Sequence, residues 1–384
     1  MTLIIFIIVL SVLVLIHELG HFLAARAFGV KALEFGLGFP PRAIGMVKEK
    51  GKWKKVSSRD QTEYKRTIWS INWLPFGGFV KLKGEEADGE NDKDSLIAKP
   101  IWQRLIVMAA GVSMNWILAV VLFSVVFMLG VPTALEDLPA GATVTDKSIV
   151  ITTVLAGSPA EEAGLKMGDQ VLKLDDTVVQ NESKLREMIK DEGDRTFKIT
   201  AKTFEGEKVF ELHPRLIDEL GYYGIGVGLA DAGTVKLGPL QAISQSVVVT
   251  AFMTKEVVFA FGGLFKDLIV ERKVTQDLSG PVGIAIMTGQ AARQGIVVLL
   301  QFAAILSINL AVINFLPIPA LDGGRAVFLA IEKIRRRPLS RKLEVGMNNI
   351  VFILLIALII LITARDLFRY SGTIWSGVRG LVGM

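Results

Sequence analysis

The stretch LIIFIIVLSVLVLIHELGHFLAARAF, residues 3–28, decides the class of fold that this chain adopts. It is long enough to cross a lipid bilayer, whose hydrocarbon core requires about 20 helical residues. The run nevertheless contains His17, Glu18 and His21, which form the pattern H-E-x-x-H. Ionisable side chains inside a membrane are costly and by default mark a functional site. The sequence therefore predicts a membrane helix that carries chemistry.

The spacing of the two histidines indicates which chemistry. His17 and His21 lie four residues apart, so on a helix both imidazoles project from one face, one turn apart. Two histidines at this spacing bind zinc, and the glutamate beside them acts as general base on water at the metal. We therefore predict one Zn²⁺ ion held by His17 and His21, with Glu18 as the catalytic base. The alternative is a chance match to a short pattern, which the membrane context disfavours.

The rest of the composition places the chain among membrane proteins. It has 384 residues, is 51% hydrophobic and has no cysteine, which excludes disulfides and thiolate metal sites. The N-terminus lacks the basic region of a signal peptide, so we expect the first apolar segment to stay in the mature protein. The fold class that we predict is an α-helical polytopic protein with the lipid bilayer as a partner and no nucleic acid. Four apolar segments are long enough to span: 1–28, 101–131, 296–324 and 345–364.

Charge predicts the orientation, because short loops rich in Lys and Arg stay on the cytoplasmic side. Residues 23–100 hold 15 Lys and Arg against 10 Asp and Glu, and residues 325–346 hold 7 against 2. Residues 132–295 hold 17 against 23. We therefore expect the region 29–100 and a basic loop at 325–344 on the cytoplasmic side, and the middle insert outside.

The predicted sides of the membrane lead to expectations for two further segments. The apolar stretch 240–265 has Lys255 and Glu256 at its centre, and a fifth span there would reverse the side of the basic loop. We therefore expect residues 231–295 to form an interfacial amphipathic region. The C-terminal tail, residues 365–384, then lies outside.

The cytoplasmic region 29–100 contains TIWSINWLPFGGFVKL at residues 67–82. Aromatic and β-branched residues punctuated by Gly and Pro favour short strands over a helix. We expect a membrane-associated β-hairpin or sheet, followed by an acidic loop at 85–94. An exposed strand edge there can hold an extended substrate by strand addition, and the residues that we expect to do so are Phe76, Gly77, Gly78, Phe79 and Val80. The alternative is an interfacial loop with aromatic anchors.

The sequence of the middle insert, residues 132–230, predicts a small α+β domain. Strand-like stretches alternate with helical segments near 158–164 and 182–190. The stretch GSPAEEAGLKMGD at 157–169, followed by VLKLD at 171–175, is similar to the signature of bacterial PDZ domains. Such a domain binds an extended peptide as an added strand, so we expect a peptide or a substrate stub here. The alternative is a spacer or plug without a ligand.

A third zinc ligand must come from elsewhere, because catalytic zinc normally takes three protein ligands and leaves one position for water. The metzincin pattern is excluded, since Ala27 stands where it needs histidine. His213 lies in the soluble insert and Glu34 in the loop after the first helix. Asp322 lies where the third apolar segment ends, on the side where the first segment ends. We therefore predict Asp322 as the third ligand.

The residues before Asp322 predict a pocket that water can enter. Pro317 and Pro319 interrupt the helix, and broken helices at membrane depth are tolerated where they are buried in protein or line a wet cavity. Asn314 can there hydrogen-bond the backbone of a substrate. The alternative for Asn314, as for Asn115 in the second segment, is a hydrogen bond between helices.

Together these motifs resemble the site-2 protease family, and within it the bacterial RseP-type regulated intramembrane proteases. The stretches that carry the resemblance are HELGH at 17–21, LPFGGFVKL at 74–82, AAGVSMNWILA at 109–119, the PDZ signature, SGPVG at 279–283 and NFLPIPALDGG at 314–324. The resemblance implies that His17, His21 and Asp322 bind zinc, that Glu18 activates water, and that Asn314 contacts the substrate. It also implies a membrane-embedded sheet around 67–82, PDZ filtering of substrates on the outer side, and residence in the bacterial inner membrane.

The chain departs from the family pattern at two points. Many members have histidine after L-D-G-G, where this chain has Arg325, and some have two PDZ domains where this chain has room for one.

We predict a zinc-dependent endopeptidase that cleaves within transmembrane segments of pre-trimmed single-span proteins, of the anti-sigma factor type, or of signal-peptide remnants. The alternative is an inactive membrane-anchored PDZ receptor or scaffold with structural zinc, which would have no use for Glu18. A metal transporter would need polar residues along successive spans. The second and fourth spans have almost no polar residues, which disfavours a transporter.

Overall fold

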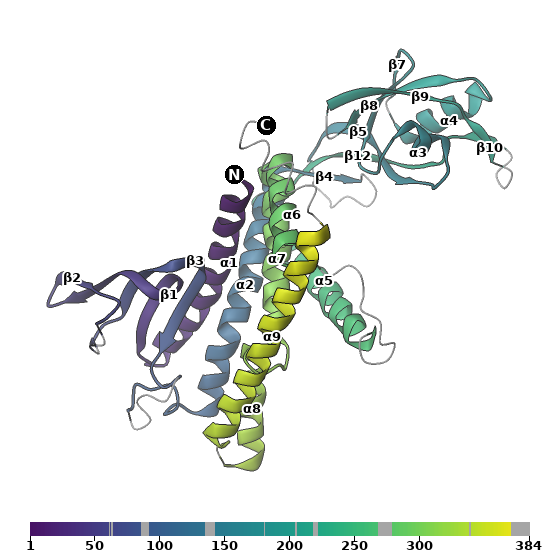
Figure 1. Ribbon diagram of the computed structural model, residues 1–384. Coiled ribbons are helices and arrows are strands. Elements are labelled where there is room, and N and C mark those ends of the chain that lie inside the picture. Colours follow the sequence, from purple (N-terminus) through teal and green to yellow (C-terminus); the bar gives the residue numbers. More distant parts are fainter. Residues whose placement is uncertain are drawn as a thin grey trace. The chain divides into compact units, whose positions relative to one another are not determined.

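The computed structural model describes residues 1–60, 62, 64–85, 92–134, 143–179, 181–203, 206–217, 222–267, 279–337 and 339–369. Within the predicted acidic loop, residues 86–91 lie outside the described part, as does the tail from residue 370. The chain divides into two compact units. The first comprises Met1–Phe123 and Gln245–Met384, and the second comprises Ser124–Ser244. Figure 1 labels helices and strands of both units.

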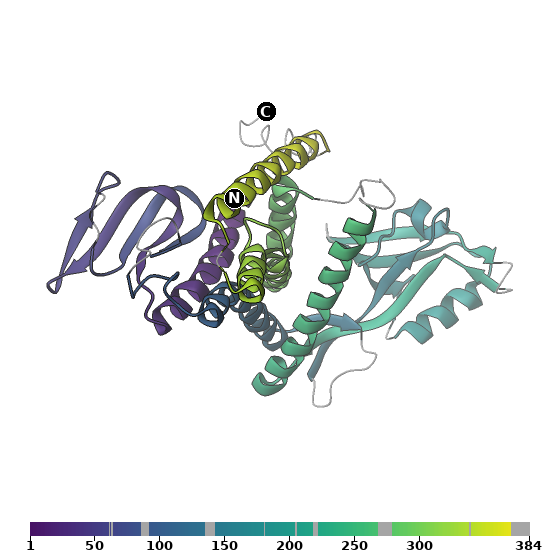
Figure 2. The ribbon, with the colours of Figure 1, turned by 90° about the horizontal axis from the view of Figure 1, so that it is seen from below.

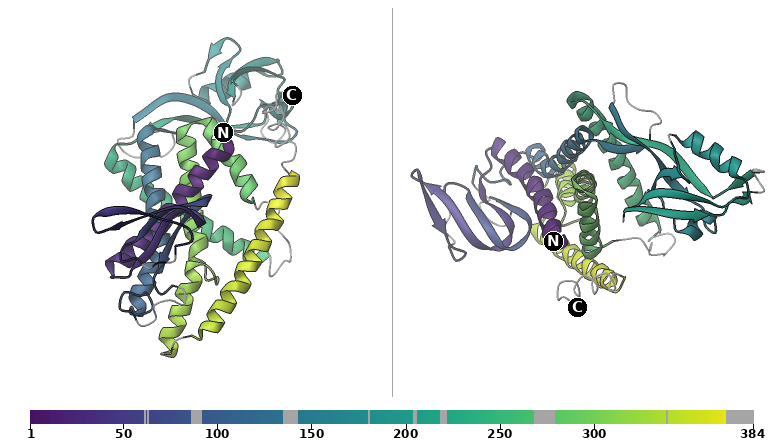
Figure 3. Two further views of the ribbon diagram at one scale, coloured as in Figure 1. Left: turned by 60° about the vertical axis from the view of Figure 1, so that its left-hand side comes forward. Right: turned by 90° about the horizontal axis from the view of Figure 1, so that it is seen from above.

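Long helices make up most of the first unit. They are α1 (Thr2–Ala27), α2 (Ile101–Leu129), α5 (Pro239–Lys266), α6 (Pro281–Gln294), α7 (Ile296–Phe315), α8 (Asp322–Arg335) and α9 (Arg341–Arg369). Within the described residues, five of them are long and apolar enough to cross a membrane: α1, α2, α5, α7 and α9. Four of these correspond to the predicted spans, and α5 is the stretch for which an interfacial position is expected. Figure 3 shows α1, α2 and α7 side by side.

Small residues let α1 and α2 approach closely. A Cβ added to Gly20 would meet the backbone carbonyl of Ala110, so only glycine fits between the two helices there. Close backbone approach at small residues is typical of helices that pack in membranes, where lipid is as apolar as the helix surface. Gly20 lies between the two histidines of α1, so this close approach of α2 falls at the metal-binding pattern.

The region around Asp322 differs from the predicted one. We expected a span over 296–324 followed by a loop, but α7 ends at Phe315 and α8 runs from Asp322 to Arg335. Pro317 and Pro319 cannot continue α7, because proline lacks the N–H donor and disfavours helix in the residue before it. Gly323 lets the first turn of α8 pack closely on the end of α7, because a Cβ there would meet the backbone carbonyl groups of Phe315 and Leu316.

A three-stranded sheet packs against α1, which confirms the prediction of strands in this region (Figure 1). Its strands are β1 (Ala32–Glu49), β2 (Lys52–Val56) and β3 (Ile68–Leu82), in the order β2-β1-β3. Phe35 of β1 pairs with both Val80 and Trp69, so the first half of β1 lies between the two halves of β3. Residues 78–82 of β3 pair with β1 along one edge. Among the described residues no strand pairs with their other edge.

The second unit is β-rich, as predicted for the middle insert. Its strands are β4 (Val131–Ala134), β5 (Thr143–Val154), β6 (Gln170–Leu174), β7 (Thr177–Val178), β8 (Phe197–Thr203), β9 (Gly206–Leu212), β10 (Arg215–Ile217), β11 (Tyr222–Gly224) and β12 (Val227–Lys236). The main sheet has the antiparallel order β4-β12-β5-β6-β8-β9. Two helices accompany it, α3 (Pro159–Ala163) and α4 (Glu182–Glu192), and Figure 2 shows α4 along the strands. Their starts are capped by the side chains of Ser158 and Asn181.

The core of this unit comes from residues of the strands and of helices α3 and α4. Its largest fully buried side chains include Ile149, Leu174, Leu185, Phe197 and Ile199. One predicted boundary is wrong: we expected an interfacial region from residue 231, but β12 continues to Lys236 between β4 and β5. The sequence of β12, VGLADAGTVK, has glycine, aspartate and alanine where a strand usually has β-branched or aromatic residues.

Candidate active site

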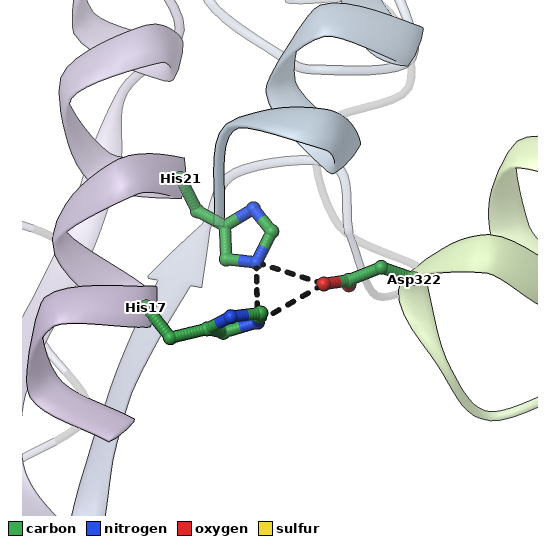
Figure 4. Close-up of side chains that lie close together, drawn as sticks. All are labelled: His17, His21 and Asp322. Atoms are coloured by element: carbon green, nitrogen blue, oxygen red, sulfur yellow. Dashed lines mark hydrogen bonds and ion pairs between the residues drawn. The ribbon is translucent and has the colours of Figure 1, made fainter. Parts of the chain in front are cut away.

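His17, His21 and Asp322 converge on one point (Figure 4). The histidines project from adjacent turns of α1, and Asp322 is the first residue of α8. Oδ2 of Asp322 lies 3.0 Å from Nε2 of His17 and 3.2 Å from Nε2 of His21, and the two Nε2 atoms lie 3.2 Å apart. The fold thus brings together the three residues that the sequence analysis selected as ligands.

These three atoms fit a zinc ion. Zinc prefers imidazole nitrogen and carboxylate oxygen at about 2.0–2.1 Å, and tetrahedral geometry then separates neighbouring ligand atoms by about 3.3 Å. The observed separations of 3.0–3.2 Å are close to that spacing. Both histidines are only 6% exposed, so the ion would be shielded on the side of α1. Within the part of the chain that the structure describes, this is the one cluster of three such side chains placed to hold a metal.

Helix α2 supports the rings from behind. Nδ1 of His21 lies 2.8 Å from the backbone carbonyl of Val107, and this contact leaves Nε2 free for a metal, as outer contacts of metal-bound histidines generally do. A Cβ added to Gly111 would meet both imidazoles, so glycine at this position makes room for them. Neither residue could be identified from sequence, because only the rotation of α2 about its axis shows which of its turns faces α1.

Glu18 lies in the same cavity as the three ligands. The cavity has a volume of about 330 Å³, and its walls include residues of α1, β3, α7 and α8. Oε2 of Glu18 accepts a hydrogen bond from the backbone N–H of Val80 at 3.2 Å. The carboxylate is thus tied to the strand that the sequence analysis connected with substrate binding.

The other predicted substrate contacts lie at the cavity or on the same strand. Asn314, Phe79 and Val80 line the cavity. Gly77 and Gly78 pack against α1, where an added Cβ would meet Val14 or Leu15. Phe76 belongs to β3.

An ion pair that the sequence analysis missed also lines the cavity. Arg325, one turn into α8, pairs with Glu85, which follows the end of β3. The backbone N–H of Leu82 also donates to Glu85, at 3.4 Å. The pair therefore ties the end of β3 to the helix that begins with Asp322.

The two rejected ligand candidates are engaged elsewhere. Glu34 forms an ion pair with Arg42 inside the β1 strand. His213 lies in the second unit, where its Nδ1 is 3.1 Å from the hydroxyl of Thr196. Of the three candidates for a third ligand, Asp322 is the one that lies beside His17 and His21.

Known proteins resemble the chain over almost its full length. Residues 5–358 match the family described as Peptidase family M50. The chain belongs to peptidase family M50. A protein of Clostridium perfringens, CPE1693, provisionally named a zinc metalloprotease, is 34% identical over 93% of this chain and 96% of its own length. The regulator of sigma-W protease RasP of Bacillus subtilis is 29% identical over 96% of this chain and 98% of its own.

Membership in family M50 confirms the prediction of a metalloendopeptidase of the site-2 protease type. Among solved structures, the PDZ domain of the SdrC-like protein Lmo2051 of Listeria monocytogenes covers 23% of the M50 chain and 92% of its own, at 24% identity and a TM-score of 0.21. The PDZ domain of the related protein Lin2157 of Listeria innocua covers 21% and 92%, at 26% identity and a TM-score of 0.20.

Proposed function

We propose that this M50 peptidase cleaves peptide bonds inside the membrane, with one Zn²⁺ held by His17, His21 and Asp322 and with Glu18 as general base. The observation that carries the proposal is the convergence of three donor atoms, from two buried histidines and a partly buried aspartate, in a cavity that also holds Glu18. Zinc bound there would supply a Lewis acid that polarises a carbonyl group and acidifies water.

The residues of the chain perform the proton transfers and the positioning. Glu18 accepts a proton from the attacking water and passes it to the amine that leaves. The Val80 N–H fixes one oxygen of this carboxylate, so the base has a defined orientation. The Val107 carbonyl orients His21 in the same way.

The free edge of β3 provides a binding site for an unwound substrate. A peptide bond in a helix is shielded by its own hydrogen bonds, so a transmembrane substrate must become extended before water can attack it. An extended segment added along residues 76–80 would form main-chain hydrogen bonds with β3 through groups other than the Val80 N–H, which donates to Glu18. Phe79 and Val80 line the cavity, so such a segment would pass beside Glu18. Asn314 of α7 offers a side-chain amide to the substrate backbone in the same cavity.

Four helices cross the membrane in this proposal: α1, α2, α7 and α9. Helix α5 stays at the interface, because Lys255 and Glu256 lie in its middle, and Nζ of Lys255 lies 5.6 Å from the ring centre of Phe259. The active site then faces the cytoplasmic side of a bacterial inner membrane and the second unit lies outside. Since the chain has no cysteine, single introduced cysteines report topology directly. We expect Lys333→Cys to be labelled only from the cytoplasm. Labelling from outside would indicate that α5 is a fifth span.

The substrates that we propose are single-span proteins shortened beforehand on the outer side, or signal-peptide remnants. The name of RasP, a regulator of sigma-W, supports substrates of the anti-sigma factor type. The second unit, as a PDZ domain, would bind the outer stub of the substrate as an added strand. The PDZ-like pattern at 157–175 includes the helix α3, which begins after Ser158.

The rival function is an inactive membrane-anchored PDZ receptor whose zinc is structural. Structural zinc sites are closed by four protein ligands, whereas three converge here beside a cavity. The experiment that separates the two functions removes the metal. Purified protein treated with a chelator should lose cleavage of a single-span substrate and regain it with added zinc. Cleavage that survives metal removal would overturn the proposal.

A further inference from the structure

We propose that Asn115 is a positioning residue of the zinc site: its side-chain carbonyl accepts a hydrogen bond from Nδ1–H of His17 and thereby holds Nε2 of that ring toward the metal. The inference rests on the proposed zinc site and goes beyond it, because it assigns a role to a residue that binds neither metal nor substrate.

Asn115 is fully buried on α2, with 0% of its surface exposed. Its Nδ2 lies 3.3 Å from Nδ1 of His17. Its Oδ1 is buried and has no hydrogen-bond partner among the described residues. A buried carbonyl oxygen without a hydrogen-bond donor is costly, so the unpaired Oδ1 beside the ring of His17 requires an explanation.

The chemistry of a metal-bound imidazole supplies that explanation. A neutral imidazole carries one proton, and a ring that presents the lone pair of Nε2 to zinc carries the proton on Nδ1. An N–H donor at Nδ1 then faces the amide nitrogen of Asn115, which is also a donor. Two donors cannot form a hydrogen bond.

Turning the amide by half a rotation removes the clash of donors at Nδ1 of His17 and gives Oδ1 a donor. The oxygen and nitrogen of an asparagine amide occupy nearly equivalent positions, and hydrogen-bond partners decide which is which. With the amide turned, Oδ1 takes the position near Nδ1 of His17 and gains a donor. The proton on Nδ1 gains an acceptor by the same movement.

Helix α2 then offers a carbonyl oxygen to Nδ1 of both histidines. Nδ1 of His21 meets the backbone carbonyl of Val107 at 2.8 Å, and Nδ1 of His17 meets the side-chain carbonyl of Asn115 about two turns further along the helix. Gly111 lies between them and leaves space for both rings. The position of Asn115 is itself fixed, because the hydroxyl of Ser307 on α7 donates to its backbone carbonyl at 2.8 Å.

The test measures the affinity for zinc alone, by competition with a chromophoric chelator, on the full chain in detergent with Glu18→Gln in every sample. Asn115→Leu keeps the approximate volume and removes the acceptor, while Asn115→Asp keeps an acceptor at the same place. Ser113→Ala is the matched control, because Ser113 is exposed on the same helix and bonds only within it, to Ala109. We expect Asn115→Leu to lower zinc affinity by about 10–100-fold, the effect typical of outer contacts to metal ligands. Asn115→Asp and Ser113→Ala should stay close to the parent.

The melting temperature separates this role from a hydrogen bond between helices. We expect the metal-free Asn115→Leu protein to melt near the metal-free parent and to gain less stability from zinc. A fall in the metal-free melting temperature with unchanged zinc affinity would overturn the inference. Equal losses of zinc affinity in Asn115→Leu and Asn115→Asp would also overturn it.

A measurement on the parent protein does not depend on whether a variant folds. The chain has three histidines, and His213→Gln identifies the exposed one, so the remaining ¹⁵N-histidine NMR signals of the zinc-loaded protein belong to His17 and His21, for both of which a proton on Nδ1 is expected. We expect His17 to carry its proton on Nδ1. A proton on Nε2 of His17 would overturn the inference while leaving zinc binding in place. Failure of the parent to bind zinc would instead overturn both this inference and the proposed function.

Discussion

The backbone N–H of Val80 donates a hydrogen bond to the carboxylate of Glu18 at 3.2 Å. Val80 lies on the part of β3 whose outer edge no described strand pairs with, and Glu18 lies between the two histidines of α1. The strand proposed to hold the substrate therefore also orients the proposed base. This contact connects substrate position with proton transfer.

Replacing Val80 by proline removes this hydrogen bond. Proline has no N–H and is tolerated in edge strands when the missing donor would have pointed away from the ladder, as the Val80 N–H does toward Glu18. We expect Val80→Pro to slow substrate cleavage about tenfold or more, since a positioned general base contributes about 10²–10⁴-fold to the rate. Zinc content should be unchanged. Val80→Ala keeps the N–H and is the control; equal rates for the two variants would refute the role of this contact.

Replacing Asp322 by alanine tests the third ligand. We expect zinc affinity to fall by more than the roughly 100-fold that loss of an outer contact causes, because one of three donor atoms is removed. The measurement is the zinc content of purified protein after dialysis against a weak chelator. Asp176→Ala, at an exposed position of the second unit, should retain the zinc of the parent. Full zinc occupancy in Asp322→Ala would show that another residue completes the site.

Gly111 gives a test in which helix propensity and metal binding oppose each other. Alanine favours a helix over glycine by about 1 kcal/mol, but a Cβ at this position would meet both imidazoles. We therefore expect Gly111→Ala to lower zinc affinity although alanine is the better helix former. Gly346→Ala is the matched control, because Gly346 lies in α9 with no atom near its added Cβ. Unchanged zinc affinity in Gly111→Ala would mean that the rings do not pack against α2 as described.

The ion pair of Arg325 and Glu85 predicts a non-additive effect on stability. Both side chains are partly buried, at 34% and 23% exposure, so each charge depends on its partner more than a surface charge does. We expect Glu85→Ala to destabilise the protein by about 1–2 kcal/mol, between the values for exposed and buried pairs. The double variant Glu85→Ala with Arg325→Met should lose less than the sum of the single losses. Additive losses in thermal unfolding would show that the two side chains do not interact.

Much of this site could be predicted from residue types alone. The spacing of His17 and His21 determines a shared helix face, and the absence of cysteine left few candidates for a third ligand, of which Asp322 stood nearest in the predicted topology. The strands of the 67–82 region followed from their aromatic and β-branched residues, punctuated by Gly and Pro.

The remainder depends on packing that a single sequence does not show. Helix α8 was expected as a loop because of its many basic residues, although Phe328 and Leu329 are buried on it. The contact of Val107 with His21 uses a backbone carbonyl, which every residue has, so no residue type could indicate it. For α5, length and composition fit both a span and an interfacial helix.

The most direct test of the account compares the parent with Glu18→Gln, using purified protein and a single-span substrate with a short outer stub. The amide has nearly the shape of the carboxylate but cannot accept the proton. We expect cleavage to fall by about 10²–10⁴-fold, while zinc content and melting temperature stay those of the parent. Cleavage at the parent rate by a zinc-loaded Glu18→Gln protein would contradict the central claim that this carboxylate is the base of an intramembrane protease.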